Sequence, residues 1–301
     1  MAVKTCIRCG VWSDANIWSG GVPGTTDQAI IQAPVTLDTS PTVNGVQIDS
    51  NGSLTFDPSA SRTLTIDVIA GAGPTTPPVN NNLINKGRLV MQPANATITH
   101  QILFTNVDET TYVGGGMAPL ATDPGFWTVD NGQAVLQGTS SKSWQRTQAE
   151  IPANAPSFTL SAGGHGWKAG DAIVLPPTAP GTATQYDERT IQSVSGNVIT
   201  VTAAITNAHP EVVLPNGQTI MPEVLNMTKN VKIKGADATH RAHTIFINNI
   251  NPVSHTIKNV ELQFLGPRKN GDKILGRWPT HFHHSMMNLM GLNVEEVTVR
   301  D

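Results

Sequence analysis

Three segments in the last third of the chain share one alternating pattern and decide the fold prediction: Asn230-Val231-Lys232-Ile233-Lys234, Asn259-Val260-Glu261-Leu262-Gln263 and Glu296-Val297-Thr298-Val299-Arg300. In each segment aliphatic residues alternate with polar ones, which is the side-chain period of an extended strand. The segments begin 29 and then 37 residues apart. Recurring strands of this kind indicate a parallel β-helix with inserted loops, in which each coil buries one aliphatic row against its neighbours.

The rest of the chain also favours short strands, and no long amphipathic helix is predicted. Gly (27) and Pro (21) are abundant among 301 residues, as expected for strands joined by many turns. Short apolar or β-branched runs recur between 11 and 92, broken by turn residues such as Ser50-Asn51-Gly52. Around Ser195-Gly196-Asn197 the pattern predicts a hairpin. We therefore predict an all-β protein.

Four segments are predicted: an N-terminal extension (1–10), a β domain (11–150), a connecting β region (151–222), and the start of the β-helix (223–301). A helix ending at Val297-Thr298-Val299 would leave an unpaired strand edge, and such edges aggregate unless they are covered. We therefore expect self-association or a protein partner at that end.

Composition excludes several partners. Charged residues are 14% and the net charge is −3, which argues against a nucleic-acid surface. No apolar run is long enough to span a membrane, and the first ten residues lack the apolar core of a secretory signal. The expectation is a soluble protein without an ordinary export signal, which fits a virion protein released by lysis or a trimmed secreted protein. Walker, dinucleotide-binding, nucleophile-elbow and His-Glu-x-x-His motifs are also missing from the sequence.

Both cysteines of the chain, Cys6 and Cys9, form one Cys-x-x-Cys motif. A zinc site would need two more ligands, which histidines would have to supply because there is no second cysteine pair. The alternatives are free thiols or a local disulfide bond.

The run from Gly276 to His284, Gly-Arg-Trp-Pro-Thr-His-Phe-His-His, contains the best candidate site. If His-Phe-His is a strand, His281 and His283 share one face and His284 points the other way. One coil earlier lies the strand candidate that begins with His243, so that all three imidazoles could gather on one side. They could hold a divalent metal or carry protons near neutral pH, or they could form an inert, hydrogen-bonded stack.

Other residues near this run complete the candidate site. Arg277 could bind a sugar carboxylate through its fork of donors, with Trp278 as a second ligand-binding residue; alternatively, Arg277 is a solvated loop residue. Glycoside hydrolysis usually needs two carboxylates. The candidates are Glu223, ranked first, Asp272 in a loop, and Glu261 and Glu295, which we expect to face solvent.

At these residues the chain resembles proteins with a G8 domain followed by a right-handed parallel β-helix, a family with hyaluronan-binding and hyaluronidase members. Four motifs carry the resemblance: Trp12-Ser13-Asp14 with Trp18 and Gly21-Val22-Pro23-Gly24, then Gly166-Trp167 with Gly170-Asp171, then Pro222-Glu223-Val224 before Asn230-Val231, and finally Gly276-Arg277-Trp278-Pro279-Thr280-His281-Phe282-His283. The segment 68–130, with the asparagines at 80–82, departs from the family pattern. The resemblance implies a G8-like N-terminal unit and contact with a polysaccharide.

Three functions remain open at this point. The first is binding of a cell-surface polysaccharide as part of a phage tail, and the second is a secreted glycan depolymerase acting through His281 and His283. The third is a purely structural tail or baseplate protein. For Trp12, Trp18 and Trp167 we expect packing roles rather than sugar contacts.

Overall fold

The computed structural model describes residues 1–71, 80–178, 183–247, 254–283 and 293–300. Within these residues the chain forms two compact units. Unit 1 combines 1–139 with 230–301, and unit 2 comprises 140–229. Strands dominate both units, and the described helices are two single 3-10 turns, η1 (Ala15–Ile17) and η2 (Glu109–Thr111). The predicted all-β class is confirmed.

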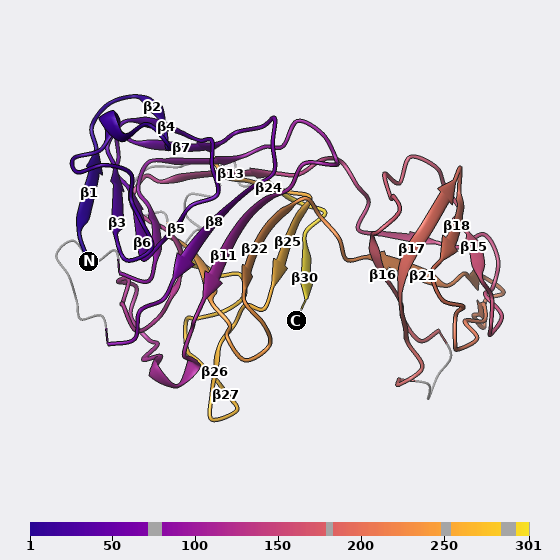
Figure 1. Ribbon diagram of the computed structural model, residues 1–301. Coiled ribbons are helices and arrows are strands. Elements are labelled where there is room, and N and C mark those ends of the chain that lie inside the picture. The colour runs from indigo at the N-terminus through magenta and orange to yellow at the C-terminus, as the bar shows by residue number, and fades with distance from the viewer. Residues whose placement is uncertain (72–79, 179–182, 248–253, 284–292, 301) are drawn as a thin grey trace. The chain divides into compact units, whose positions relative to one another are not determined.

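Unit 1 is a parallel β-helix built from three sheets (Figure 1). Sheet A has the order β1 (Val3–Cys6), β3 (Gln28–Ile31), β6 (Gly45–Ile48), β9 (Leu83–Asn85), β12 (Gly125–Thr128), β23 (His243–Ile247), β28 (Phe282–His283). Sheet B has the order β2 (Gly10–Val11), β4 (Pro34–Leu37), β7 (Ser53–Phe56), β10 (Arg88–Met91), β13 (Gln133–Gln137), β24 (Thr256–Lys258), β29 (Asn293–Glu295). Sheet C has the order β5 (Thr42–Val43), β8 (Arg62–Asp67), β11 (His100–Thr105), β22 (Val231–Gly235), β25 (Val260–Gln263), β30 (Thr298–Arg300).

One coil of the helix passes through sheets A, B and C in turn, and the next coil stacks on it in parallel register. The repeat seen in the sequence is confirmed in sheet C, where Ile233 pairs with Leu262 and Leu262 with Val299. β23 and β28 also pair in parallel, as predicted for consecutive coils. The coils begin at β1, however, so the segment predicted to be a separate G8-like unit supplies the first coils of the same helix.

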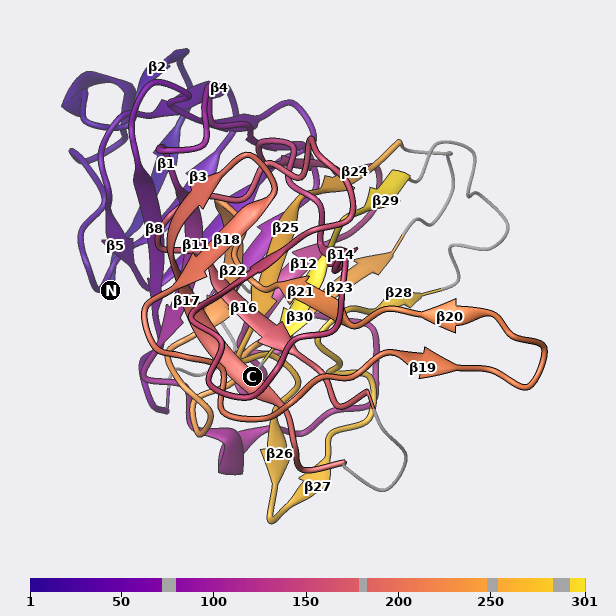
Figure 2. The same cartoon turned by 90° about the vertical axis from the view of Figure 1, so that its right-hand side faces the viewer.

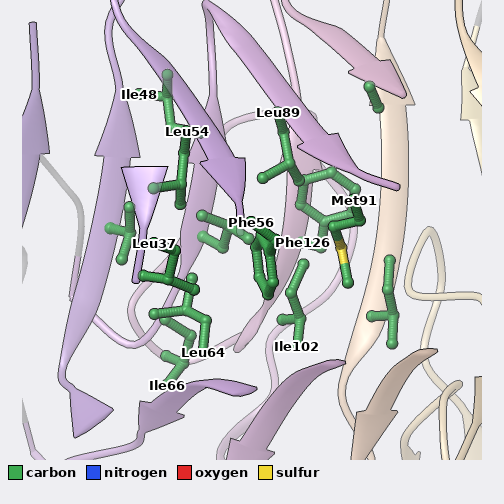
Figure 3. Close-up of a cluster of buried hydrophobic side chains, with 14 of the residues drawn as sticks. Leu37, Ile48, Leu54, Phe56, Leu64, Ile66, Leu89, Met91, Ile102 and Phe126 are labelled. Atoms are coloured by element: carbon green, nitrogen blue, oxygen red, sulfur yellow. The ribbon is translucent and has the colours of Figure 1, made fainter. Parts of the chain in front are cut away.

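The interior is a continuous column of apolar side chains, because every second residue of each strand points inward. Figure 3 shows part of it, with Phe56 and Phe126 lying among Leu54, Leu64 and Ile102, all of them fully buried. Each such side chain contributes roughly 1.5–3 kcal/mol by leaving water. The column thus links successive coils into one core.

Two tryptophans close the N-terminal end of this core. Trp12 is fully buried, Trp18 is 5% exposed, and their rings meet edge to face at 4.9 Å. The indole N–H of Trp18 donates to the carbonyl of Trp12 at 2.9 Å. Asp14 caps η1, and Ile17, the last residue of η1, is buried in the same core. The predicted packing role of both tryptophans is confirmed.

Buried asparagines order the region where sequence reasoning found no regular pattern. Asn44, just before β6, donates to the side chain of Asn81 at 2.7 Å. Asn82, just before β9, donates to Leu120 and accepts from the backbone of Gly125 and the indole of Trp127. Their amides satisfy backbone groups that the loops of long coils leave unpaired. The asparagines at 80–82, where the sequence departs from the family pattern, therefore belong to a set of buried, hydrogen-bonded amides.

Unit 2 has its own antiparallel sheet and its own core. The strand order is β14 (Trp144–Arg146), β21 (Glu223–Asn226), β16 (Ala172–Leu175), β17 (Asp187–Ser195), β18 (Val198–Val201), β15 (Ser157–Thr159). Thr147 bridges Leu160, which joins the two outer strands and closes the sheet on itself. The predicted hairpin is confirmed as β17–β18. Trp167 is 5% exposed and Asp171 accepts from the backbone of Lys168, so both shape a packed turn as expected.

The division of the chain therefore differs from the four predicted segments. Unit 2 starts at Ser140 and ends at Lys229, and it interrupts one coil of the β-helix between β13 and β22. At that point the side chain of Asn230 joins the two ends of the interrupted coil. It accepts a hydrogen bond from the backbone N–H of Thr139 at 2.9 Å and donates one to the Thr139 hydroxyl at 3.1 Å. In the sequence, the residues around 140 and 229 look like ordinary turns, and they did not indicate that a separate unit is inserted between them.

Because Thr139 and Asn230 are hydrogen-bonded neighbours, a short Gly-Ser linker in place of 140–229 is expected to leave unit 1 folded. Circular dichroism should show a β spectrum, and thermal melting should remain cooperative. A chain that aggregates or melts without a transition would show that unit 2 is needed for the coil to form.

Candidate functional site

The three histidines of the predicted site share one face of sheet A, where His281 and His283 are neighbours but His243 is set apart from His283. The register pairs Phe246 with Phe282 and Ile247 with His283. Because His243 and Ile247 have the same parity, His243 and His283 both point outward. However, His243 lies four residues before the partner of His283. The histidines thus lie on one face of the sheet, as predicted. The ring of His243, however, is displaced along the strand from that of His283 instead of lying beside it.

His243 is fully buried in an aromatic pocket on the outside of sheet A. Its ring lies against Trp127, edge to face at 4.9 Å, and Nε2 lies 3.2 Å from the carbonyl of Asp123. A Cβ on Gly125 would come within 2.5 Å of Nε2, so glycine provides the space. Burial lowers the pKa of His243 to about 3, and the nearby Arg277 guanidinium adds to the effect. The imidazole is therefore neutral at physiological pH.

Arg277 is an internal counter-ion. Arg277 and Asp123 are both fully buried, with Nε of Arg277 2.8 Å from Oδ2 of Asp123. The guanidinium also lies over the ring of Trp127, at 4.8 Å from the centroid. The structure thus corrects the predicted role: the fork of donors that was expected to hold a sugar carboxylate faces the protein interior. Asp123 further accepts from the backbone N–H groups of Val113 and Gly114.

His281, His283 and Trp278 are half-buried at the end of sheet A. The two imidazoles meet edge to face at 5.3 Å, and Nδ1 of His281 lies 3.1 Å from the carbonyl of Gly276. His284 lies outside the described residues. Within those residues no three His, Cys, Asp or Glu side chains are arranged to hold a metal. Cys6 is buried and Cys9 is exposed, and both are free thiols.

The four carboxylates do not gather around these histidines. Glu223 belongs to unit 2, where it pairs with Arg146 at 3.0 Å. Asp272 is exposed in the short hairpin of β26 (Arg268–Lys269) and β27 (Asp272–Lys273). Glu295 is exposed and pairs with Lys258 at 3.1 Å. Glu261, expected to face solvent, is 1% exposed because Lys232 and Arg300 of the adjacent coils cover it.

A different feature, the corner groove, lies where the chain turns from sheet A into sheet B. It has a volume of about 640 Å³ and is lined by residues from five successive coils, of which the first contributes an isoleucine and the next four contribute polar residues: Ile7, Gln32, Gln47, Asp49, Ser50, Asn51, Lys86, Asp130, Asn131. Stacked coils are about 4.8 Å apart, so the groove extends over roughly 20 Å along the helix.

The backbone aligns this lining by repeating one hydrogen bond from coil to coil. The N–H of Gln32 donates to Cys6, that of Asp49 to Ile31, and that of Lys86 to Ile48, at 2.8–2.9 Å. Ile7, Gln32, Asp49 and Lys86 therefore occupy equivalent positions one residue past the strand.

Glycines keep these corners tight. A Cβ on Gly87 would lie 2.2 Å from the carbonyl oxygens of both Asp49 and Gly52, and one on Gly132 would lie 2.2 Å from that of Asn85. The coils can therefore stack closely only with glycine there.

Side-chain hydrogen bonds fix the acidic groups of the groove. Asp49 accepts from the amides of Gln32 at 2.9 Å and Gln47 at 2.6 Å. Nζ of Lys86 lies 3.4 Å from Oδ2 of Asp130. Both glutamines thus turn their amide nitrogens to Asp49, which leaves their amide oxygens as acceptors. The groove offers alternating donors and acceptors with little net charge.

Sequence reasoning did not find this groove. Its signal was present in the turns Asp49-Ser50-Asn51-Gly52, Lys86-Gly87 and Asp130-Asn131-Gly132, each of which follows a buried strand of sheet A. Read as turns only, they carry no information on function. Their alignment becomes visible once the register between coils is known.

Comparisons with known proteins give little further constraint. No family model matches the chain, and no curated protein matches it. Among solved structures, a tailspike of Acinetobacter baumannii bacteriophage AP22, determined in complex with a capsular saccharide, matches with a TM-score of 0.24 and 12% identity. The alignment covers 69% of this chain and 31% of the tailspike, so the chain spans about a third of that protein. Within the described residues, no helix is long and apolar enough to cross a membrane.

Proposed function

We propose that this protein binds a polysaccharide strand along the corner groove. The observation that supports the proposal is the succession of polar side chains from four consecutive coils along this groove. A linear glycan presents hydroxyl groups at a regular interval, and the coil spacing of about 4.8 Å is close to the length of one sugar unit in an extended chain. Equivalent positions on successive coils can therefore meet equivalent groups on successive sugars.

The charge of the groove favours a neutral glycan over a strongly anionic one. Asp49 and Asp130 face one lysine, Lys86, and the rest of the lining is uncharged. The amides of Asn51 and Asn131 and the hydroxyl of Ser50 can donate to and accept from sugar hydroxyls at small desolvation cost. The sequence resemblance to G8 proteins with hyaluronan-binding members also implies a glycan partner, though an anionic one.

The biological setting follows the sequence predictions. We propose a surface-polysaccharide-binding component of a phage tail. Glycan cleavage and a purely structural tail role are the alternatives. Of the two carboxylates predicted to be catalytic, Glu223 pairs with Arg146 in unit 2, and Asp272 is exposed in the β26–β27 hairpin.

Binding is tested on an array of bacterial capsular and O-antigen polysaccharides, with the triple variant Asn51→Ala, Lys86→Ala, Asn131→Ala as the probe of the groove. Each lost hydrogen bond weakens binding by about 0.5–1.5 kcal/mol. We therefore expect the triple variant to lose at least tenfold in affinity for any glycan that the native protein binds. Lys273→Ala, on an exposed hairpin, is the matched control and should bind normally.

Two outcomes would contradict the proposal. One is an array with no glycan bound by the native protein. The other is a triple variant with native affinity and a native melting temperature, which would place the binding elsewhere.

A further inference from the structure

The surface of unit 2 carries a half-exposed tryptophan that no packing role explains. Trp144, on β14, is 50% exposed, whereas Trp12, Trp18, Trp127 and Trp167 are all at most 5% exposed. Tryptophan is rarely left in water without a reason, because its ring has the largest apolar area of any side chain. Its surroundings on the sheet therefore matter.

Trp144 begins a straight row of outward side chains across four strands. Trp144 pairs with Leu225, Leu225 with Val174, and Val174 with Glu188. The alternate residues Val224 and Ile173 point into the core and are at most 1% exposed. Figure 2 labels the strands β14, β21, β16 and β17 that carry this row. The row has an indole at one end and two aliphatic side chains beside it.

A charged pair lies next to the indole on the same face. Arg146 follows Trp144 by two residues, and its Nη2 lies 3.0 Å from Oε1 of Glu223. The two side chains are 39% and 43% exposed. This single contact leaves other guanidinium donors and the second carboxylate oxygen turned to solvent. Residues two apart on a strand are about 6.8 Å apart, which is the scale of one sugar ring.

We propose that Trp144, Arg146 and Glu223 form a second glycan site, which binds one pyranose ring. The apolar face of the sugar stacks on the indole, and two neighbouring hydroxyls bind the Arg146–Glu223 pair, one accepting from the guanidinium and one donating to the carboxylate. The site lies on unit 2 and stands independently of the corner groove. It also gives Glu223 a binding role in place of the catalytic one predicted from the sequence.

A sugar fits this surface better than a protein does. A stable protein interface needs about 800 Å² on each partner with several apolar anchors. Here one indole and two aliphatic side chains are flanked at once by charged groups. A patch of that size and composition matches a single amphipathic ring.

The test uses intrinsic tryptophan fluorescence of the full chain with four soluble probes: maltohexaose, cellohexaose, chitohexaose and hyaluronan hexasaccharide. We expect at least one of them, at millimolar concentration, to change the emission of the native protein. Calorimetry with that probe should show roughly tenfold weaker binding for Trp144→Leu. Trp144→Phe should retain part of the affinity. Tyr186→Leu, which removes the other half-exposed aromatic residue of unit 2, is the control and should bind as the native protein does.

The outcomes separate this site from the groove. If the groove triple variant binds normally while Trp144→Leu is weakened, the second site stands and the groove proposal fails. If none of the four probes binds, or if Trp144→Leu binds like the native protein, the second site is overturned. Melting temperatures of all variants should equal that of the native protein, since the substituted side chains are exposed.

Discussion

Replacing Arg277 by methionine is expected to destabilise unit 1 by about 3–5 kcal/mol. The substitution keeps an unbranched apolar stem but removes the guanidinium, and it leaves the carboxylate of Asp123, which is fully buried, without its counter-ion. It also removes the cation from the face of Trp127. Urea denaturation followed by tryptophan fluorescence should show the loss as a lower midpoint with an unchanged slope.

The double variant Asp123→Asn, Arg277→Met is the control for this prediction. It removes the buried charge altogether, while the amide oxygen of the asparagine can still accept from one of the two backbone N–H groups, that of Val113 or that of Gly114. We expect it to recover at least half of the lost free energy of unfolding. A single variant that loses less than about 1 kcal/mol would mean that the ion pair contributes little to the stability of the coil.

Acid is expected to destabilise unit 1 as the pH falls from about 6.5 to about 4, because its buried histidines stay neutral in the folded state. Burial lowers the pKa of His243 to about 3 and that of His255 to about 4. The unfolded chain takes up these protons near pH 6.5, so it binds more protons than the folded chain below that pH. Each histidine then removes up to about 1.4 kcal/mol per pH unit as the pH falls.

The variant His243→Gln isolates the largest of these contributions. Glutamine can still donate to the carbonyl of Asp123, but it does not titrate. Its melting temperature should therefore fall less steeply with acid than that of the native protein. Parallel curves for the two proteins would show that His243 is not held neutral by its surroundings. Asp123 of unit 1 adds little in this window: burial raises its pKa, but hydrogen bonds and the Arg277 cation outweigh burial and lower the pKa.

The sequence predicted the part of the fold that rests on short-range periodicity. The alternation in 230–234, 259–263 and 296–300 led directly to β22, β25 and β30, and to the sheet that they form. Because side chains alternate between the two faces of a strand, the sequence also predicted that His281 and His283 share one face. These properties depend on single strands, so a single sequence carries them.

Properties that depend on register between coils could not be predicted. The offset between His243 and His283 is set by the lengths of the loops between β23 and β28. The long coil that contains unit 2 hides the continuity of β13 with β22. Burial of Arg277 depends on Asp123, which is 154 residues away in sequence.

The same reason explains why the corner groove was missed. Asp49 and Lys86 are ordinary turn residues in the sequence, and they line a common groove because glycines at 52, 87 and 132 let the corners stack. The sequence analysis instead placed the site at the end of sheet A, because the aromatic and histidine motifs lie there. Polar grooves on solenoids are built from unremarkable residues at equivalent positions.

A crystal structure of the protein with the best-bound oligosaccharide of the array tests the central claim most directly. The account predicts a sugar chain in the corner groove, parallel to the helix axis and within hydrogen-bonding distance of Asn51, Lys86 and Asn131. A sugar bound instead against His281 and His283, with the corner groove empty, would contradict it.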